Sequence, residues 1–179
     1  MPGVIALLDD VHTVKVEALW DEMERRFAVP KGYPGALPHI TFHLGSHDVD
    51  AGAEAVVERV ARRTKPLTIS TSGLGVFGGP APVLYLTVAR SPEVAALAAY
   101  LGAEMEAAGF PSTDPYFAPE RWIPHITIAH RNLAGVALGP LLAWLVEQPL
   151  AWEVPLRSLS IARETEKSVE VLAEFPLSG

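Results

Sequence analysis

The chain has 179 residues, of which 49% are hydrophobic and 20% are charged, and its formal net charge is −7 at pH 7. A chain of this composition and length can bury a core without disulfides or metal ions. The absence of cysteine excludes disulfides, thiolate zinc sites and cysteine nucleophiles; the acidic balance argues against a protein that coats nucleic acid, which needs a basic face to neutralise many phosphates.

No stretch of the sequence has the roughly 20 apolar residues that a membrane-spanning helix needs. The apolar N-terminus is followed at once by Asp9 and Asp10 and has no basic region before it, which disfavours a signal peptide. We therefore expect a cytoplasmic protein that does not contact a membrane. We also expect it to act as a monomer.

Strands and helices are predicted to alternate along the whole chain. The helix after Ser91 is the best marked, because Ser91 can cap it, Pro92 suits its first position and Gly109 can end it. Because no long linker interrupts the pattern, we predict one α+β domain over residues 1–179. In chain order, the expected elements are a strand at 4–8, a helix at 16–27, a strand at 39–44, a helix at 53–60 with Asp48 or Asp50 as its cap, strands at 67–74 and 83–89, the helix from 92, a strand at 125–130, a helix at 138–146, and a hairpin of strands at 152–162 and 169–175.

One tetrapeptide, Pro-His-Ile-Thr, occurs twice, at residues 38–41 and 124–127. Each copy follows a proline-rich loop that holds aromatic residues, opens a predicted strand and precedes a predicted helix. The same four residues in the same context indicate an internal duplication. The two strands would then be related by a pseudo-two-fold axis.

The side chains of a strand alternate between its two faces. His39 and Thr41 therefore share one face of the first strand, and His125 and Thr127 share one face of the other. Each half of the molecule is expected to present one imidazole and one hydroxyl to a common cleft. Polar groups on otherwise apolar strands are costly unless they are hydrogen-bonded or used.

Two facing histidines suit metal-independent, in-line phosphoryl transfer. One neutral imidazole takes a proton from the attacking oxygen, and the other, as imidazolium, gives a proton to the leaving oxygen. The hydroxyls of Thr41 and Thr127 would bind the non-bridging phosphate oxygens, where charge accumulates in the transition state. The simpler alternatives are two hydrogen-bonded core histidines and two threonines chosen for strand propensity; the duplication favours the functional interpretation.

A metal site is not expected. His39, His43 and His47 are spaced four apart, but four strand residues span about 13 Å, which is too far for shared coordination. No cofactor is predicted either. His43 falls on the face of His39, deeper along the strand, with either a supporting or a structural role.

The loops before the two motifs supply further candidates for substrate contacts. Aromatic residues there could stack on a nucleobase, or could cover the core, which is the preferred interpretation for Phe117. Lys31 and Arg121 flank the expected cleft in equivalent loops and could attract phosphate. The aromatic candidates are Tyr33, Tyr116, Phe117 and Trp122.

The twin His-x-Thr motifs resemble those of the 2H phosphoesterase superfamily, in its branch of 2′-5′ RNA ligases and RNA 2′,3′-cyclic phosphodiesterases. Supporting similarity lies at residues 75–77, 83–86, 109–110 and 174–177. The resemblance implies a bilobal fold of two duplicated αβ lobes, with antiparallel sheets around a central cleft. It implies opening of 2′,3′-cyclic phosphates to 2′-phosphates, and in some members the reverse joining of RNA ends. It also implies that His39 and His125 are catalytic and that Thr41 and Thr127 bind phosphate.

The sequence departs from this family shortly after each motif, where many relatives carry arginine. His43 and His130 stand at those places in the sequence pattern, and Arg131 follows His130. His130 falls on the opposite face from His125 unless the strand bulges, so its role stays open; Arg131 is either a substrate contact or a surface residue. The substrate is accordingly an RNA end, a nucleotide, or a small metabolite such as ADP-ribose cyclic phosphate. A non-catalytic RNA- or nucleotide-binding module is the alternative of another class.

Overall fold

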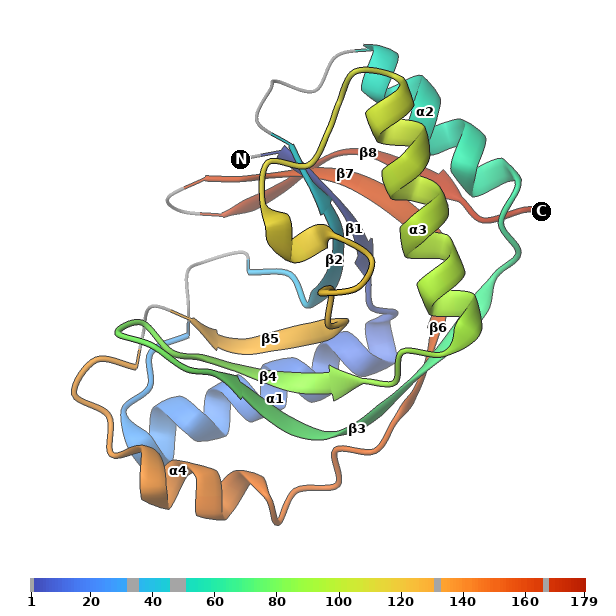
Figure 1. Ribbon diagram of the computed structural model, residues 1–179. Coiled ribbons are helices and arrows are strands. Elements are labelled where there is room, and N and C mark those ends of the chain that lie inside the picture. The colour runs from blue at the N-terminus through green and yellow to red at the C-terminus, as the bar shows by residue number, and fades with distance from the viewer. Residues whose placement is uncertain (1, 32–35, 46–50, 131–132, 166–167) are drawn as a thin grey trace.

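The computed structural model describes residues 2–31, 36–45, 51–130, 133–165 and 168–179. Its elements follow the predicted alternation of strands and helices (Figure 1). They are β1 (Pro2–Leu7), α1 (Asp10–Phe27), β2 (His39–Leu44), α2 (Ala51–Arg62), β3 (Leu67–Phe77), β4 (Val83–Val88), α3 (Pro92–Ala107), the 3-10 turn η1 (Pro115–Phe117), β5 (His125–His130), α4 (Leu138–Leu145), β6 (Glu153–Leu156), β7 (Ser158–Glu164) and β8 (Val169–Pro176).

The strands form two four-stranded sheets in which every neighbouring pair is antiparallel. One sheet has the order β2-β1-β7-β8, and the other has the order β5-β4-β3-β6. The two motif-bearing strands, β2 and β5, occupy equivalent edges, and each pairs with the strand that precedes it in the chain. This arrangement confirms the predicted α+β class and its two antiparallel sheets.

The helices cover the sheets in a crossed pattern. α1 connects β1 to β2 but lies against the other sheet, where the indole Nε1 of Trp20 donates a 2.9 Å hydrogen bond to the carbonyl oxygen of Ile128 on β5. In the same way, α3 connects β4 to β5 but packs on β2 and beside α2. Figure 1 shows α2 and α3 against the first sheet, with α1 and α4 against the second. The connecting helices therefore tie the two halves together.

The predicted strand at 152–162 is in fact two strands that belong to different sheets. β6 pairs with β3 and β7 pairs with β1, with a break at Arg157, whose carbonyl accepts a 2.8 Å bond from the Leu177 N–H. The apolar alternation shifts by one residue at the break, from Val154 and Leu156 to Leu159 and Ile161, a mark that the prediction of a single strand did not use. Pro155 fits because β6 is an edge strand and needs fewer N–H donors. The predicted hairpin of the last two strands is confirmed by the pairing of β7 with β8.

The helix ends follow local capping rules. Ser91 caps α3 by accepting a 3.3 Å bond from the Val94 N–H, and Gly109 follows the helix with φ of 87°, as predicted. α1 begins earlier than its apolar pattern, because the Asp9 carboxylate caps it at the His12 N–H, 2.9 Å away. The candidate caps Asp48 and Asp50 lie outside the described residues.

Candidate active site

Both Pro-His-Ile-Thr copies open a motif-bearing strand. His39 is the first residue of β2 and His125 is the first residue of β5, and these strands lie against each other where the two sheets meet. In each copy the histidine and the threonine are half-buried, whereas the isoleucine between them is fully buried. The side chains of Thr41 and Thr127 therefore share a face with the imidazoles, as the alternation predicts.

Each of the two imidazoles is held by an equivalent hydrogen bond to the backbone. Nδ1 of His39 lies 2.6 Å from the carbonyl oxygen of Leu37, and Nδ1 of His125 lies 2.8 Å from the carbonyl oxygen of Ile123. A carbonyl oxygen only accepts hydrogen bonds, so each Nδ1 must carry the proton. In the neutral ring, Nε2 then holds the lone pair and can accept a proton.

The prolines explain why the motif includes the residue before each histidine. Pro38 and Pro124 are buried, and their carbonyl oxygens accept bonds from the N–H groups of Leu8 and Val88, both at 3.2 Å. Proline fixes the φ angle, so the carbonyl one residue earlier can turn back to the imidazole. The tetrapeptide is thus a unit that fixes both the strand start and the histidine tautomer.

The two motifs also interact electrostatically. Burial is the largest influence on the pKa of His125 and lowers it below its ordinary value, while the hydrogen bond to Ile123 raises it. A charge on His39 lowers the pKa of His125 further. The duplicated histidines therefore lie close enough that protonation of one disfavours protonation of the other.

Within the described part of the chain, three aromatic side chains surround His125. The ring of Phe77 on β3 lies edge-on to it, with centroids 5.0 Å apart and planes at 84°, and the ring of Tyr85 on β4 is also 5.0 Å away. Tyr116 on η1 approaches at 6.1 Å. Phe77 and Tyr85 stack on each other at 4.3 Å. We call Phe77, Tyr85 and Tyr116 the aromatic cluster; it supplies apolar surroundings for His125.

A glycine makes room for this cluster. Gly75 on β3 pairs across the sheet with Tyr85, and a Cβ atom at Gly75 would lie only 2.3 Å from the tyrosine ring. No roles were predicted for Phe77 and Tyr85 from the sequence. Phe77 follows Gly75 by two residues in the sequence, whereas Tyr85 lies opposite Gly75 only in the folded sheet. Their placement depends on the pairing of β3 with β4, which residue spacing alone does not give.

Both motif strands contain an irregularity at the same place. In β2, Thr41 pairs with Ile5 and His43 pairs with Val4, so Phe42 is the extra residue. In β5, Thr127 and Ala129 pair with adjacent residues of β4 and leave Ile128 as the extra residue. A bulge of this kind breaks the simple alternation of side chains, so faces predicted beyond the threonine change.

His43 is therefore not on the face of His39, where the alternation placed it. It is buried, with 3% of its surface exposed, and its Nε2 atom has no hydrogen-bond partner among the described residues. Burial lowers the pKa of His43, against a raising effect from a backbone hydrogen bond at Phe110. The position and the neutral ring indicate a structural role for His43.

The bulge in β5 changes the face on which His130 lies in the opposite sense to His43. His130 pairs with Val83, which pairs with Phe77, and the Phe77 ring contacts His125. The bulge thus places the exposed His130 on the face of His125. The residue pattern put His130 on that face only if the strand bulged in this way, so His130 remains a candidate for substrate contact.

Trp122, for which stacking on a nucleobase and covering the core were the two alternatives, lies in the core rather than at the surface. It is 3% exposed, its ring packs on Phe42 at 5.3 Å, and its Nε1 donates a 3.1 Å hydrogen bond to the Thr41 carbonyl. The loop before β5 is therefore fastened to β2 beside the first motif. Ser112 in the same loop adds a 3.1 Å bond to the Leu44 carbonyl.

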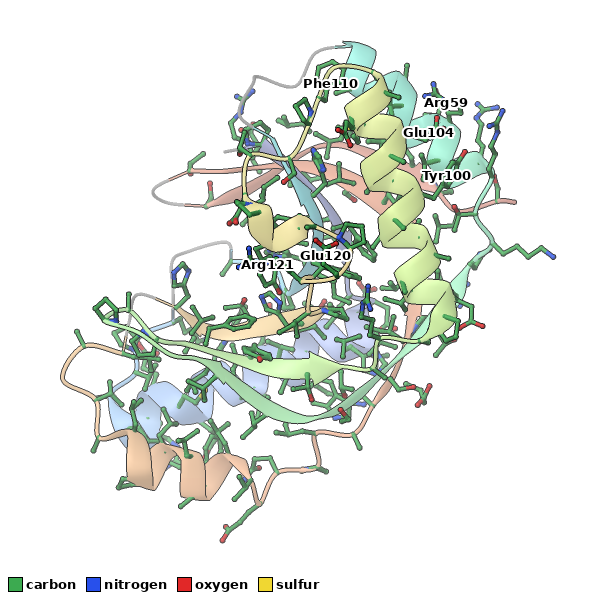
Figure 2. All side chains as sticks on the ribbon, in the orientation of Figure 1. Arg59, Tyr100, Glu104, Phe110, Glu120 and Arg121 are labelled. Atoms are coloured by element: carbon green, nitrogen blue, oxygen red, sulfur yellow. The ribbon has the colours of Figure 1, made fainter. Side chains whose placement is uncertain are left out.

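The remaining candidates are distributed as follows. Lys31 is exposed and forms an ion pair with Asp21. Phe117 is half-buried and packs against the hydrophobic core, as preferred. Figure 2 labels Arg121 beside Glu120 on the loop between η1 and β5, and Arg121 is exposed. Tyr33 and Arg131 lie outside the described residues.

Metal-binding and membrane-spanning features can be judged over the described ranges. Within them, no group of three or more acidic, histidine or cysteine side chains is arranged to hold a metal ion. None of the helices there combines the length and the apolar character needed to cross a membrane. Metal independence itself stays a prediction.

The fold is shared with several solved structures. The crystal structure of TT0787 of Thermus thermophilus aligns over 99% of this chain and 98% of its own, with a TM-score of 0.69 and 18% identity. Escherichia coli LigT complexed with 3′-AMP aligns over 100% of both chains, with a TM-score of 0.62 and 16% identity. LigT complexed with NADP+ gives a TM-score of 0.61 at 14% identity over 99% of this chain and 97% of its own.

Sequence comparison leads to the same group. A Bacillus mycoides (strain KBAB4) protein named "Putative phosphoesterase" is 25% identical over 143 residues, which cover 76% of each chain. Proteins of the same name from Bacillus anthracis are 24% identical over 140 residues, again over 76% of each chain. The family model described as the 2′-5′ RNA ligase superfamily matches residues 10–167. With both His-x-Thr motifs inside that match, the chain belongs to the 2′-5′ RNA ligase superfamily of 2H phosphoesterases.

Proposed function

We propose that the protein hydrolyses 2′,3′-cyclic phosphates, on RNA ends or nucleotides, to 2′-phosphates without a metal ion. The observation that carries the proposal is the matched state of His39 and His125. Each ring is anchored through Nδ1 to the carbonyl two residues earlier, so Nε2 of each ring is the nitrogen that exchanges protons. Membership of the family and the similarity to proteins named as phosphoesterases support the reaction class.

In the proposed reaction, a water oxygen attacks phosphorus while the bond between phosphorus and O3′ breaks. One neutral imidazole takes a proton from the water, and the other, as imidazolium, gives a proton to O3′. The product carries its phosphate on O2′ and has a free 3′-hydroxyl. The two rings finish with their protonation states exchanged, and proton exchange with solvent resets them.

We assign the proton acceptor to His125 and the proton donor to His39. The buried surroundings of His125 lower its pKa, which favours the neutral ring that a base requires. A proton on His39 lowers the pKa of His125 as well. The singly protonated pair, with the charge on His39, is therefore the reactive state.

The threonine hydroxyls are proposed to bind the phosphate group. Thr41 and Thr127 stand two residues after the histidines, on the same face and half-buried. We assign them as hydrogen-bond donors to the two non-bridging phosphate oxygens. Such donors stabilise the transition state most when they are already oriented before the substrate binds.

A small substrate is the second candidate that a specific observation favours. Solved structures of LigT are complexes with 3′-AMP and with NADP+, and NADP+ contains an ADP-ribose unit. The net charge of −7 on this chain also suits a ligand with one or two phosphates better than a long RNA. Cyclic mononucleotides and ADP-ribose cyclic phosphate therefore belong in the substrate panel. In 2′-5′ ligation a 5′-hydroxyl oxygen would attack phosphorus in place of water while the bond to O3′ breaks, with the same two proton transfers, and adding an RNA that ends in a 5′-hydroxyl tests this.

The test uses an oligonucleotide with a 2′,3′-cyclic phosphate end, a cyclic mononucleotide and ADP-ribose cyclic phosphate, each with excess chelator in ¹⁸O-labelled water. We expect a 2′-phosphate product with one ¹⁸O atom, identified by ³¹P NMR and mass spectrometry. A 3′-phosphate product or a requirement for divalent metal would contradict the proposal. Tight binding without turnover of any substrate would support the non-catalytic module instead.

A further inference from the structure

A tyrosine hydroxyl lies beside the anchored nitrogen of His125. Tyr116 belongs to η1, and its backbone N–H donates a 2.9 Å bond to the Asp114 carboxylate, which caps this turn. The turn directs the phenol toward β5, where its ring lies 5.8 Å from Phe77 and 6.1 Å from His125. The tyrosine thus reaches the second motif from a position nine residues before His125 in the chain.

The Tyr116 hydroxyl is hydrogen-bonded to both backbone groups of Ile123, the carbonyl and the N–H. It donates a 2.5 Å hydrogen bond to the Ile123 carbonyl, and it accepts a 3.3 Å bond from the Ile123 N–H. The same oxygen lies 3.1 Å from Nδ1 of His125. Because its proton is directed to the carbonyl, the hydroxyl oxygen is the acceptor in its contact with Nδ1–H.

The hydroxyl keeps its proton under ordinary conditions. Burial raises the pKa of Tyr116 to about 12, against a lowering effect of the hydrogen bond to Ile123. The neutral phenol is therefore a permanent part of the network and does not exchange protons with the substrate at neutral pH. Tyr116 is therefore unsuited to act as a general acid or base, and can affect the reaction only by acting on His125.

We propose that Tyr116 is a positioning residue for His125, whose Nδ1 proton it shares with the Ile123 carbonyl. Two acceptors fix the ring plane and exclude the tautomer with its proton on Nε2. When Nε2 takes a proton, the two oxygen atoms also stabilise the positive charge that appears on the ring. The kinetic part of this inference rests on the proposed function, whereas its effect on His125 does not.

The direct test is Tyr116→Phe, which keeps the ring and removes the hydroxyl. In protein labelled with ¹⁵N at histidine, NMR titration should show a lower pKa for His125 and a mixture of its two neutral tautomers. Among the described residues, His39, Tyr85 and Tyr116 itself are titratable groups close to His125, and His130 lies on the same face, so His39 and His130 must be followed in the same titration. Loss of one such hydrogen bond should lower kcat by about 3- to 10-fold, with KM within about twofold.

Tyr100→Phe is the matched control. Its hydroxyl accepts a 3.4 Å bond from Arg63, and Figure 2 shows Tyr100 on α3, away from β5. This variant should leave the tautomer of His125 and the turnover unchanged. If Tyr116→Phe does not fold, 3-fluorotyrosine placed at position 116 keeps the shape and weakens the acceptor, and the pKa of His125 should shift in the same direction.

An unchanged tautomer and pKa of His125 in the Tyr116 variants would overturn the inference. A changed tautomer in a protein that turns over no cyclic phosphate would support the positioning role and reject the proposed function. Normal tautomers with a tenfold loss of kcat would overturn the positioning role and leave the proposed function standing. The NMR and kinetic readouts thus separate the two claims.

Discussion

Phe77 lies edge-on to His125, with ring centroids 5.0 Å apart and ring planes at 84°. The contact brings a residue of β3 onto the first residue of β5, across the intervening strand β4. It helps to exclude water from the imidazole, and burial is the largest cause of the lowered pKa of His125. The aromatic cluster is therefore one physical source of the lowered pKa of His125.

Phe77→Ala should move the pH profile of kcat/KM. A base must be neutral to act, so activity rises with pH as His125 loses its proton, and the lowered pKa places this rise below the ordinary value of about 6.5. Exposing the ring to water raises its pKa, so the acidic limb should shift to higher pH. Phe27→Ala removes a half-buried ring that packs on Trp144 at 5.5 Å, and should not shift the limb. A shift to lower pH in Phe77→Ala would contradict the assignment of His125 as the base.

Gly75→Ala should damage both stability and activity. The added Cβ would lie 2.3 Å from the Tyr85 ring, so the ring or the strand must move. Overpacking of this kind costs about 1–3 kcal/mol, which urea unfolding can measure. Gly102→Ala is the matched control, because no atom lies within 4 Å of its added Cβ in α3; it should stabilise the helix by about 0.5–1 kcal/mol. Equal effects of the two substitutions would contradict the packing seen at Tyr85.

Valine in place of Thr41 or Thr127 keeps the shape and removes the hydroxyl. If these hydroxyls bind phosphate oxygens in the transition state, each variant should lose about 10²-fold in kcat, by analogy with other donors that stabilise developing charge. The melting temperature should change little in comparison. Thr68→Val, at an exposed position of β3, provides the control and should keep full activity. A change in KM alone would indicate a role in binding only.

His43 makes a prediction about stability and pH. Its pKa is lowered in the folded protein, whereas in the unfolded chain it is about 6.5. Between these values the unfolded state binds a proton that the folded state does not, so stability falls as the pH drops below about 6.5. His43→Leu should make this decline shallower in urea unfolding at pH values of about 5 to 7. Part of the decline should remain, because the pKa of His125 is lowered as well. A decline with unchanged slope in His43→Leu would contradict the burial of a neutral His43.

The sequence alone predicted the parts of the site that depend on local pattern. The repeated tetrapeptide and the alternation of strand side chains placed His39 beside Thr41 and His125 beside Thr127. The same alternation failed after the threonines, because the extra residues Phe42 and Ile128 reset it. A bulge depends on pairing with the neighbouring strand, and nothing in the motif itself marks it.

Long-range pairing accounts for the other differences. The aromatic cluster forms because β3 and β4 carry Phe77 and Tyr85 to β5, and strand order is not encoded in spacing along one strand. The division at Arg157 leaves only a one-residue shift in the apolar alternation, between Leu156 and Leu159, and it is the strand pairing that assigns the two strands to different sheets. The place of Trp122 in a loop left open whether it stacks on a nucleobase or covers the core, and its hydrogen bond to the Thr41 carbonyl places it between the two halves.

The central claim is that His39 and His125 form one proton-transfer pair, and a double-mutant cycle measures it most directly. Turnover of a nucleoside 2′,3′-cyclic phosphate, with chelator present, should be compared in His39→Ala, His125→Ala and the double variant. Each single variant should lose at least about 10²-fold in kcat while still binding the 2′-phosphate product, and the double variant should lose little more, because the pair acts as a unit. Turnover within twofold of the parent protein in either single variant would contradict the account.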